Sequence, residues 1–269
     1  MQTLDYIRDV QIYQNKSGYR FSVDALLLHS FASTNQPKLI ADLCAGSGII
    51  GLLSAKKYPA AHVYLVELQK SLFNLCVKNI ELNNMSSSTT AIHSDINDIT
   101  AEAKKQENLL SIGAHKCRHH KHIKKETGSP FELLMENAGC FDLVLSNPPF
   151  RKVMAGMVSS GDEKAIARHE VKISIHQLAD AASRLLAHRG RFCVIHLPDR
   201  MTEIFDSMRA AGIESKRLRS VHSNLESEAS MILIEGVKGA KPGIKIDPPL
   251  ILYNSDGSCT KELDAMYNG

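Results

Sequence analysis

A short turn of rigid and planar residues follows one of the most apolar segments of the chain. Residues 147–150 are Asn-Pro-Pro-Phe, directly after the run 141–146. Prolines fix φ and leave their carbonyl groups free of strand hydrogen bonds, and an asparagine amide supplies a donor and an acceptor in one plane. We therefore predict that Asn147 and the Pro148 carbonyl accept hydrogen bonds from a planar amine. Phe150 would stack on the ring that carries this amine.

A glycine-rich segment lies in the N-terminal half. Residues 42–48 are Asp-Leu-Cys-Ala-Gly-Ser-Gly, and with Gly51 they complete the pattern G-x-G-x-x-G between a predicted strand and a predicted helix. This pattern fits dinucleotides as well as S-adenosylmethionine. A dinucleotide needs a helix N-terminus beneath its pyrophosphate, whereas S-adenosylmethionine has no phosphate and carries an α-ammonium group. Asp42 is placed to bind that group, so we predict an S-adenosylmethionine site.

Further residues of the predicted cofactor site follow from their places at strand ends. Glu67 ends the second predicted strand and would accept hydrogen bonds from both ribose hydroxyls, while Asp95 follows the third and would bind the adenine amine. Cys44, Gly46 and Gly48 belong to the loop itself. The structural alternatives are a helix-capping carboxylate for Asp42 and solvated strand-end acids for Glu67 and Asp95.

The glycine-rich loop and the Asn-Pro-Pro-Phe turn together predict methyl transfer to an sp² amine nitrogen. The two hydrogen bonds at the turn would draw electron density onto the nitrogen and direct its lone pair at the methyl group. A strong base is unnecessary before attack, because the proton leaves afterwards. Most of the rate acceleration should come from in-line positioning.

Apolar runs alternate with amphipathic stretches, which is typical of parallel βα units. We predict a Rossmann-like α/β fold, with a mainly parallel twisted sheet, helices on both faces and an antiparallel C-terminal strand pair. The predicted strands are 39–43, 63–67, 90–93, 141–146, 191–197, 217–222 and 230–235. The predicted helices are 47–57, one with Leu72, Leu75, Cys76, Asn79 and Ile80 at spacings of three and four, 173–187 and 199–211.

Two segments interrupt this alternation. Residues 1–37 form a predicted N-terminal extension, in which an extended piece leads into an N-capped helix. The methyltransferase domain would then span 38–269. Residues of about 101–138 form a long insertion between strands, predicted as a mobile loop with one short helix.

The composition limits the classes of protein to consider. The chain has 269 residues, 43% of them hydrophobic, and a net charge of +3. No apolar run approaches the ~18 residues of a membrane span, and the N-terminus lacks the pattern of a signal peptide. The six cysteines are scattered, several within apolar patterns. These features predict a cytoplasmic protein with reduced thiols and no membrane partner.

Basic residues concentrate in two segments. Residues 115–125 combine four histidines, a cysteine and several lysines and arginines. Zinc is one interpretation, but the irregular spacing and the interleaved lysines favour a basic loop that contacts RNA phosphates or a solvated loop, and we predict no metal. Residues 151–172 are predicted to form a lid over the acceptor; their basic residues are Arg151, Lys152, Lys164, Arg168 and Lys172. Further basic residues could extend this surface or be solvated: Arg184, Arg189, Arg191, Lys216, Arg217 and Arg219.

With these motifs placed, the chain resembles the bacterial methyltransferases that modify the adenine amine next to the anticodon of valine tRNA. The resemblance covers nearly the whole chain and rests on residues 19–28, 42–48, 147–150, 167–170, 197–200, 260–262 and Tyr267. It implies an S-adenosylmethionine-dependent enzyme with a tRNA substrate. It also implies that the N-terminal extension 1–37 lies over the cofactor pocket and that Phe21 and Asp24 line or cover this pocket. The His-rich insertion departs from the family pattern.

Other functions remain open at this point. A glutamine-amide methyltransferase of release factors shares the turn motif, but usually carries a helical N-terminal domain that 37 residues cannot supply. An rRNA guanine-N2 methyltransferase usually carries a duplicated domain, and a DNA adenine methyltransferase needs a target-recognition domain. The sequence contains Asp42, Glu67 and Asn147 together, which argues against a non-catalytic RNA-binding module with this fold.

Overall fold

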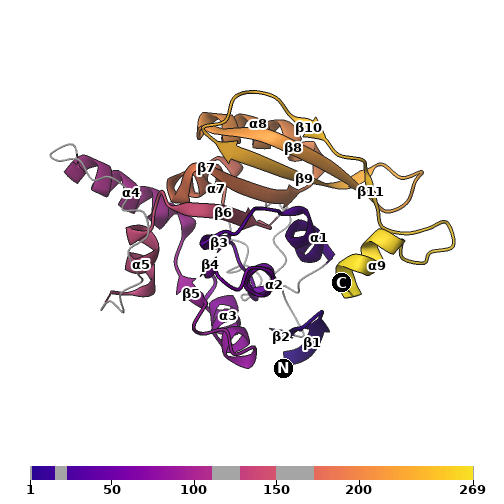
Figure 1. Ribbon diagram of the computed structural model, residues 1–269, viewed down its shortest axis with the longest axis horizontal. Coiled ribbons are helices and arrows are strands. Elements are labelled where there is room, and N and C mark those ends of the chain that lie inside the picture. The colour runs from indigo at the N-terminus through magenta and orange to yellow at the C-terminus, as the bar shows by residue number, and fades with distance from the viewer. Residues whose placement is uncertain (1, 16–22, 111–127, 150–172, 269) are drawn as a thin grey trace, which may run out of the picture.

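The computed structural model describes residues 2–15, 23–110, 128–149 and 173–268. A single large sheet runs through the centre of this part of the chain (Figure 1). Its strands are β3 (Leu39–Leu43), β4 (His62–Glu67), β5 (Thr89–His93), β6 (Phe141–Ser146), β7 (Leu186–His196), β8 (Ile213–His222), β9 (Ala229–Lys238), β10 (Lys245–Ile246) and β11 (Leu250–Ile251). Their order is β10-β8-β9-β7-β6-β3-β4-β5, and β11 also pairs with β8.

The pairing agrees with the predicted sheet. Strands β5, β4, β3, β6 and β7 are mutually parallel, and β9 runs antiparallel to both β7 and β8. The chain order reverses between β3 and β6, because the sheet grows outward from β3 through β4 and from β6 through β7. In an open α/β sheet, a ligand crevice lies at the carboxyl ends of the strands at such a reversal.

Helices cover both faces of the sheet. They are α1 (Val23–Phe31), α2 (Ile49–Lys57), α3 (Lys70–Leu82), α4 (Ile96–Leu110), α5 (Pro130–Glu136), α7 (Ile175–Leu185), α8 (Met201–Ala210) and α9 (Lys261–Asn268), with a 3-10 turn η1 (Pro198–Arg200). Successive residues of a strand point to opposite faces of the sheet. Alternate strand residues therefore face two separate cores. One core joins α1, α2, α3 and α9 to the sheet, and the other joins α4, α5, α7 and α8.

A hairpin precedes the first helix. Strands β1 (Gln2–Ile7) and β2 (Val10–Asn15) form a separate two-stranded antiparallel sheet. Ile7, Val10 and Ile12 are buried in the same core as α1, α2 and α3. The N-terminal residues therefore share the core of the main domain, and the predicted boundary at residue 37 marks no separate core.

The predicted insertion differs from the structure in its described part. We expected one short helix between residues 101 and 138, but α4 is a 15-residue helix that reaches Leu110, and α5 follows at Pro130. Ile96, Ile99 and Ala103 are buried at spacings of three and four, which explains why this segment is helical. In α5, the Ser129 hydroxyl accepts from the Glu132 backbone and completes a capping box.

None of the helices in the described ranges is both long enough and apolar enough to cross a membrane.

Candidate active site

The two predicted motifs lie side by side at the point where the strand order reverses. β3 and β6 are parallel neighbours, with Leu43 opposite Ser146 in the register. The buried Ser146 hydroxyl donates to the Leu43 carbonyl at 2.7 Å. The glycine-rich loop after β3 and the turn that begins at Asn147 therefore leave the sheet together.

The glycine-rich loop has an unusual backbone. Its φ angle is +63° at Cys44, +60° at Gly46 and +90° at Gly48, so every second residue is left-handed. Glycine adopts this conformation without steric cost, while Cys44 does so at a cost of about 1–2 kcal/mol. A Cβ atom at Gly48 would also come within 3.0 Å of Leu65. This backbone explains the glycines of the motif and leaves Cys44 as a strained residue within the loop.

Glu67 clamps the loop from the end of β4. Its Oε2 accepts from the Gly46 backbone at 2.8 Å, and its Oε1 accepts from the Gln69 backbone at 2.7 Å. Burial raises the pKa of this carboxyl, and the backbone hydrogen bonds oppose that change. Each carboxylate oxygen has a second lone pair, so Glu67 can still accept hydrogen bonds from hydroxyl groups, as predicted for the ribose.

Asp42 is wholly buried beneath the loop. Its Oδ2 accepts from the Gly51 backbone at 2.9 Å, while Oδ1 has no hydrogen-bond partner among the described residues. Burial raises the pKa of Asp42 to about 8; the Gly51 hydrogen bond opposes this change and the charge of Glu67 adds to it. This geometry shows Asp42 bracing the start of α2. Its predicted contact with an ammonium group stays a prediction.

Gly51 sets the distance between α2 and the sheet. A Cβ atom there would lie 2.0 Å from Leu65 Cδ2. This close approach accounts for the third glycine of the G-x-G-x-x-G pattern, which is needed for helix–strand packing.

Asp95 follows β5 at the edge of the sheet where the parallel strands end, as the glycine-rich loop follows β3. Its Oδ1 accepts from the Asn97 backbone at 2.8 Å, which makes it a local cap at the start of α4. Burial chiefly raises the pKa of the Cys44 thiol, and the charges of Glu67, Asp42 and Asp95 add to this effect. Asp95 is therefore close enough to the loop to act on Cys44 electrostatically, and its role toward adenine stays a prediction.

Asn147 is the clearest candidate for contact with an acceptor. Its side chain is 9% exposed, and the described residues contribute no hydrogen bond to its amide. The donor and the acceptor of this amide are therefore available to a ligand. Pro148 beside it is buried, and Pro149 is exposed. Phe150, predicted to stack on the acceptor, lies outside the described residues.

Several other predicted residues also fall outside the described part of the chain. These are Phe21, the histidine cluster 115–125 and the basic segment 151–172. Asp24 is described; it is buried in the first turn of α1. Burial is the main cause that raises the pKa of Tyr267 in α9, and the charge of Asp24 adds to it, so α1 begins near α9. Among the described residues, no group of three or more His, Cys, Asp or Glu could hold a metal ion.

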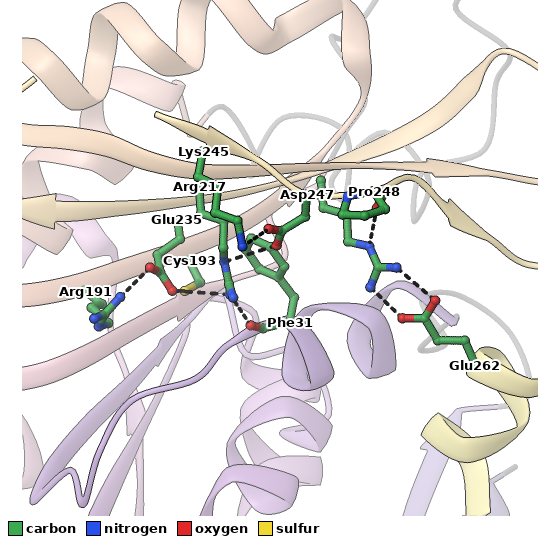
Figure 2. A network of polar contacts seen from close by, with 10 residues as sticks. Phe31, Arg191, Cys193, Arg217, Glu235, Lys245, Asp247, Pro248 and Glu262 are labelled. Atoms are coloured by element: carbon green, nitrogen blue, oxygen red, sulfur yellow. Dashed lines mark hydrogen bonds and ion pairs between the residues drawn. The ribbon is translucent and has the colours of Figure 1, made fainter. Parts of the chain in front are cut away.

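Three arginines that we considered for an RNA surface belong to a polar network (Figure 2). Arg191 and Arg217 both pair with the buried Glu235, and Arg217 donates to the Phe31 carbonyl at the end of α1. Arg219 pairs with Glu262 in two hydrogen bonds. Arg217 and Arg219 thus hold α1 and α9 against the sheet, and the extension of a basic surface over these positions stays a prediction.

Sequence reasoning missed how α3 contributes to the loop. Cys76 donates to the Gly46 carbonyl at 3.1 Å, and Asn79 donates to the Ser47 carbonyl at 2.9 Å. The buried Ser47 hydroxyl has no partner among the described residues. Asn79 could have been noticed, because it is an amide in an otherwise apolar helical stripe.

The residues of the loop fit a cofactor that carries hydroxyl groups and a positive charge. The unpartnered Asp42 Oδ1 and Ser47 hydroxyl, together with the spare acceptors of Glu67, are the polar atoms that such a group requires. Comparison with known proteins points to the same chemistry. The model of the Methyltransferase small domain family matches residues 22–111.

Curated relatives match over most of their length. A protein of Dyadobacter fermentans is 21% identical over 91% of this chain and 87% of its own, and one of Shewanella woodyi is 24% identical over 94% and 92%. Both are named tRNA1(Val) (adenine(37)-N6)-methyltransferase. The chain is an S-adenosylmethionine-dependent methyltransferase.

Solved structures confirm the predicted fold class of this methyltransferase. A predicted O-methyltransferase of Agrobacterium tumefaciens superposes with a TM-score of 0.63, at 19% identity, over 91% of this chain and 95% of that one. A 16S rRNA methyltransferase of Thermus thermophilus, solved with AdoMet and guanosine, gives 0.54 at 17% identity over 88% and 50%. At these identities the likeness shows the fold alone.

Proposed function

We propose that this methyltransferase transfers a methyl group from S-adenosylmethionine to the exocyclic N6 amine of an adenine in tRNA. The observation that carries the proposal is the position of Asn147, nearly buried at the end of β6 beside the glycine-rich loop, with no hydrogen bond from another described residue to its amide. An exocyclic amine has two N–H groups, which match the Asn147 carbonyl oxygen and the Pro148 carbonyl. The names of the relatives supply the substrate: adenine 37 of a valine tRNA.

When bound, S-adenosylmethionine supplies a methyl group on a positively charged sulfur. Within the proposal, Glu67 accepts from the ribose hydroxyls and Asp95 from the adenine amine of this cofactor. Oδ1 of Asp42, which has no partner among the described residues, would accept a hydrogen bond from the ammonium group of this cofactor, whose positive charge favours the ionised form of this carboxyl. Phe21, Asp24, Cys44, Gly46 and Gly48 complete the pocket.

On the acceptor side, the chain orients the target base. Asn147 and Pro148 hold the amine, and Phe150 stacks on the ring, a contact worth about 1–3 kcal/mol. An adenine can reach such a turn only after it leaves its stack. The amine loses its proton after the nitrogen–carbon bond has formed, so none of these residues has to act as a strong base. The basic segments 115–125 and 151–172 would contact tRNA phosphates.

Transfer of label from tritiated S-adenosylmethionine tests the proposal. Bulk tRNA, rRNA, DNA and protein are incubated separately with the enzyme, and labelled nucleic acid is digested to nucleosides. We expect N6-methyladenosine from tRNA. An unmodified valine tRNA transcript should accept label, whereas a matched transcript with guanine in place of adenine 37 should not. Label in protein, in rRNA guanine or in no fraction would contradict the proposal.

A further inference from the structure

The amide of Asn79 joins two parts of the molecule that are distant in sequence. Asn79 is 0% exposed. Its Nδ2 donates to the Ser47 carbonyl at 2.9 Å and to the Tyr13 carbonyl at 3.1 Å, and its Oδ1 accepts from the Tyr13 backbone at 2.7 Å. A reversed amide would place oxygen against two carbonyl oxygens, so the network fixes its orientation. One buried side chain thus connects β2 to the glycine-rich loop.

A second amide, four residues later at the C-cap of α3, also binds β2. Asn83 Oδ1 accepts from the Gln11 backbone at 2.9 Å, and its Nδ2 donates to the Gln11 carbonyl at 2.7 Å. Four residues of helix advance about 6 Å, and two residues of strand advance about 6.8 Å. The spacing of the two asparagines therefore matches the spacing of every second residue along β2. Their amides form the hydrogen bonds that a neighbouring strand would otherwise form.

This docking matters to the hairpin, because a two-stranded sheet is marginal by itself. Figure 1 shows β1 and β2 in the lower part of the view, near α2 and α3 and apart from the main sheet. The side chains of Asn79 and Asn83 provide hydrogen bonds to the backbone of β2 that the main sheet does not provide. Of these two residues, Asn79 alone also binds the loop.

The same helix holds two consecutive carbonyl groups of the loop. Cys76 donates to Gly46 and Asn79 to Ser47, and the two side chains lie three residues apart on one face of α3. The backbone N–H of Gly46 is held by Glu67. The left-handed turn of the loop at Gly46 and Gly48 is therefore set by side chains on both sides.

We propose that Asn79 is a positioning residue for the cofactor loop, and that it couples docking of the β1–β2 hairpin to the affinity for S-adenosylmethionine. When Tyr13 leaves, the Asn79 amide loses two of its three hydrogen bonds and no longer holds the Ser47 carbonyl in place. Coupling between two sites is reciprocal, so a bound cofactor also stabilises the hairpin. The proposal rests on the cofactor and not on the RNA acceptor.

Two matched variants test the role of Asn79. Asn79→Ala and Asn83→Ala each remove two hydrogen bonds to β2, but only Asn79→Ala releases the loop. By calorimetry, we expect the Kd for S-adenosylmethionine to rise at least about tenfold in Asn79→Ala, a difference of about 1.4 kcal/mol, and less than about threefold in Asn83→Ala. With tRNA as acceptor, Asn79→Ala should raise KM for the cofactor with kcat nearly unchanged. Equal loss of cofactor affinity in both variants, or none in Asn79→Ala, would overturn the proposal.

The protein without any substitution provides a test that does not depend on the folding of a variant. Amide hydrogen exchange is measured by NMR with and without saturating S-adenosylmethionine. We expect the cofactor to slow exchange at Tyr13, whose N–H binds Asn79, by at least about threefold. The effect at Gln11 should be smaller. Unchanged exchange at Tyr13 would contradict the coupling. Absence of methyl transfer to tRNA would leave both binding measurements intact, so the two proposals fail separately.

Discussion

Asp42 is a carboxyl group held in the interior with one hydrogen bond, from Gly51. Its pKa is raised to about 8 in the folded protein, against about 3.9 in an unfolded chain. At pH values between these two pKa values, Asp42 keeps its proton in the folded state and has lost it in the unfolded state. Since stability falls with rising pH wherever the folded state binds more protons, Asp42 should make the protein less stable as the pH rises toward 8.

Replacement of Asp42 by Asn removes this titration while keeping an acceptor for the Gly51 N–H. We expect the free energy of unfolding of Asp42→Asn to fall less between pH 5 and pH 8 than that of the original protein. Urea unfolding at several pH values measures the difference. The exposed Asp264→Asn serves as a control and should follow the original protein. A constant difference between Asp42→Asn and the original protein across this range would refute the assigned pKa.

At the residue scale, the sequence placed Asn147, Glu67 and the glycines at the carboxyl ends of strands, where the structure has them, but it did not indicate all of their partners. The bracing contact of Asp42 with Gly51 could not be predicted, because a carboxylate at a strand end has the same sequence pattern whether it faces a ligand or a helix N-terminus. Only the folded structure, in which Asp42 is buried beneath the loop, distinguishes these two roles.

A polar network helps to hold α1, in addition to the core that α1 shares with the sheet. Arg217 donates to the Phe31 carbonyl at the end of α1, lies 4.0 Å from the centroid of the Phe31 ring and pairs with Glu235 (Figure 2). The Glu235 side chain is 5% exposed. Removal of one partner from a buried ion pair leaves the other charge poorly compensated.

We expect Arg217→Ala to lower the free energy of unfolding by about 2–3 kcal/mol, somewhat less than for a wholly broken pair because Arg191 still binds Glu235. Arg209→Ala is the matched control. Arg209 is 75% exposed and lies 3.8 Å from Glu214, so its loss should change stability by less than about 0.5 kcal/mol. Denaturant unfolding of both variants provides the comparison. Equal losses would show that the network does not hold α1.

Elements with a strong period were predicted, and elements that depend on distant partners were not. All five residues expected on one face of α3 are buried there. The hairpin β1–β2 and helix α9 were missed, although Val10 and Ile12 alternate in the sequence. Docking of β2 by Asn79 and Asn83 joins residues 66 or more positions apart, which periodicity in either segment cannot indicate.

At the scale of the whole molecule, the cofactor should stabilise the fold, because it would bind the loop that contacts of Asp42, Cys76 and Asn79 connect to α2 and α3. Binding to the folded state at a hundred times Kd adds about 2.7 kcal/mol of stability. We therefore expect S-adenosylmethionine to raise Tm in a thermal melt. NAD, the alternative ligand for the G-x-G-x-x-G pattern, should leave Tm unchanged. A shift with NAD alone would overturn the cofactor assignment.

Methylation of valine tRNA by the Asn147→Ala variant is the most direct test of the account. Original and variant enzymes are incubated with an unmodified transcript, N6-methyladenosine is quantified after digestion, and the Kd for S-adenosylmethionine is measured in parallel. The account predicts at least about a hundredfold less product from Asn147→Ala, with Kd within about threefold. Product formation at the original rate by Asn147→Ala would contradict it.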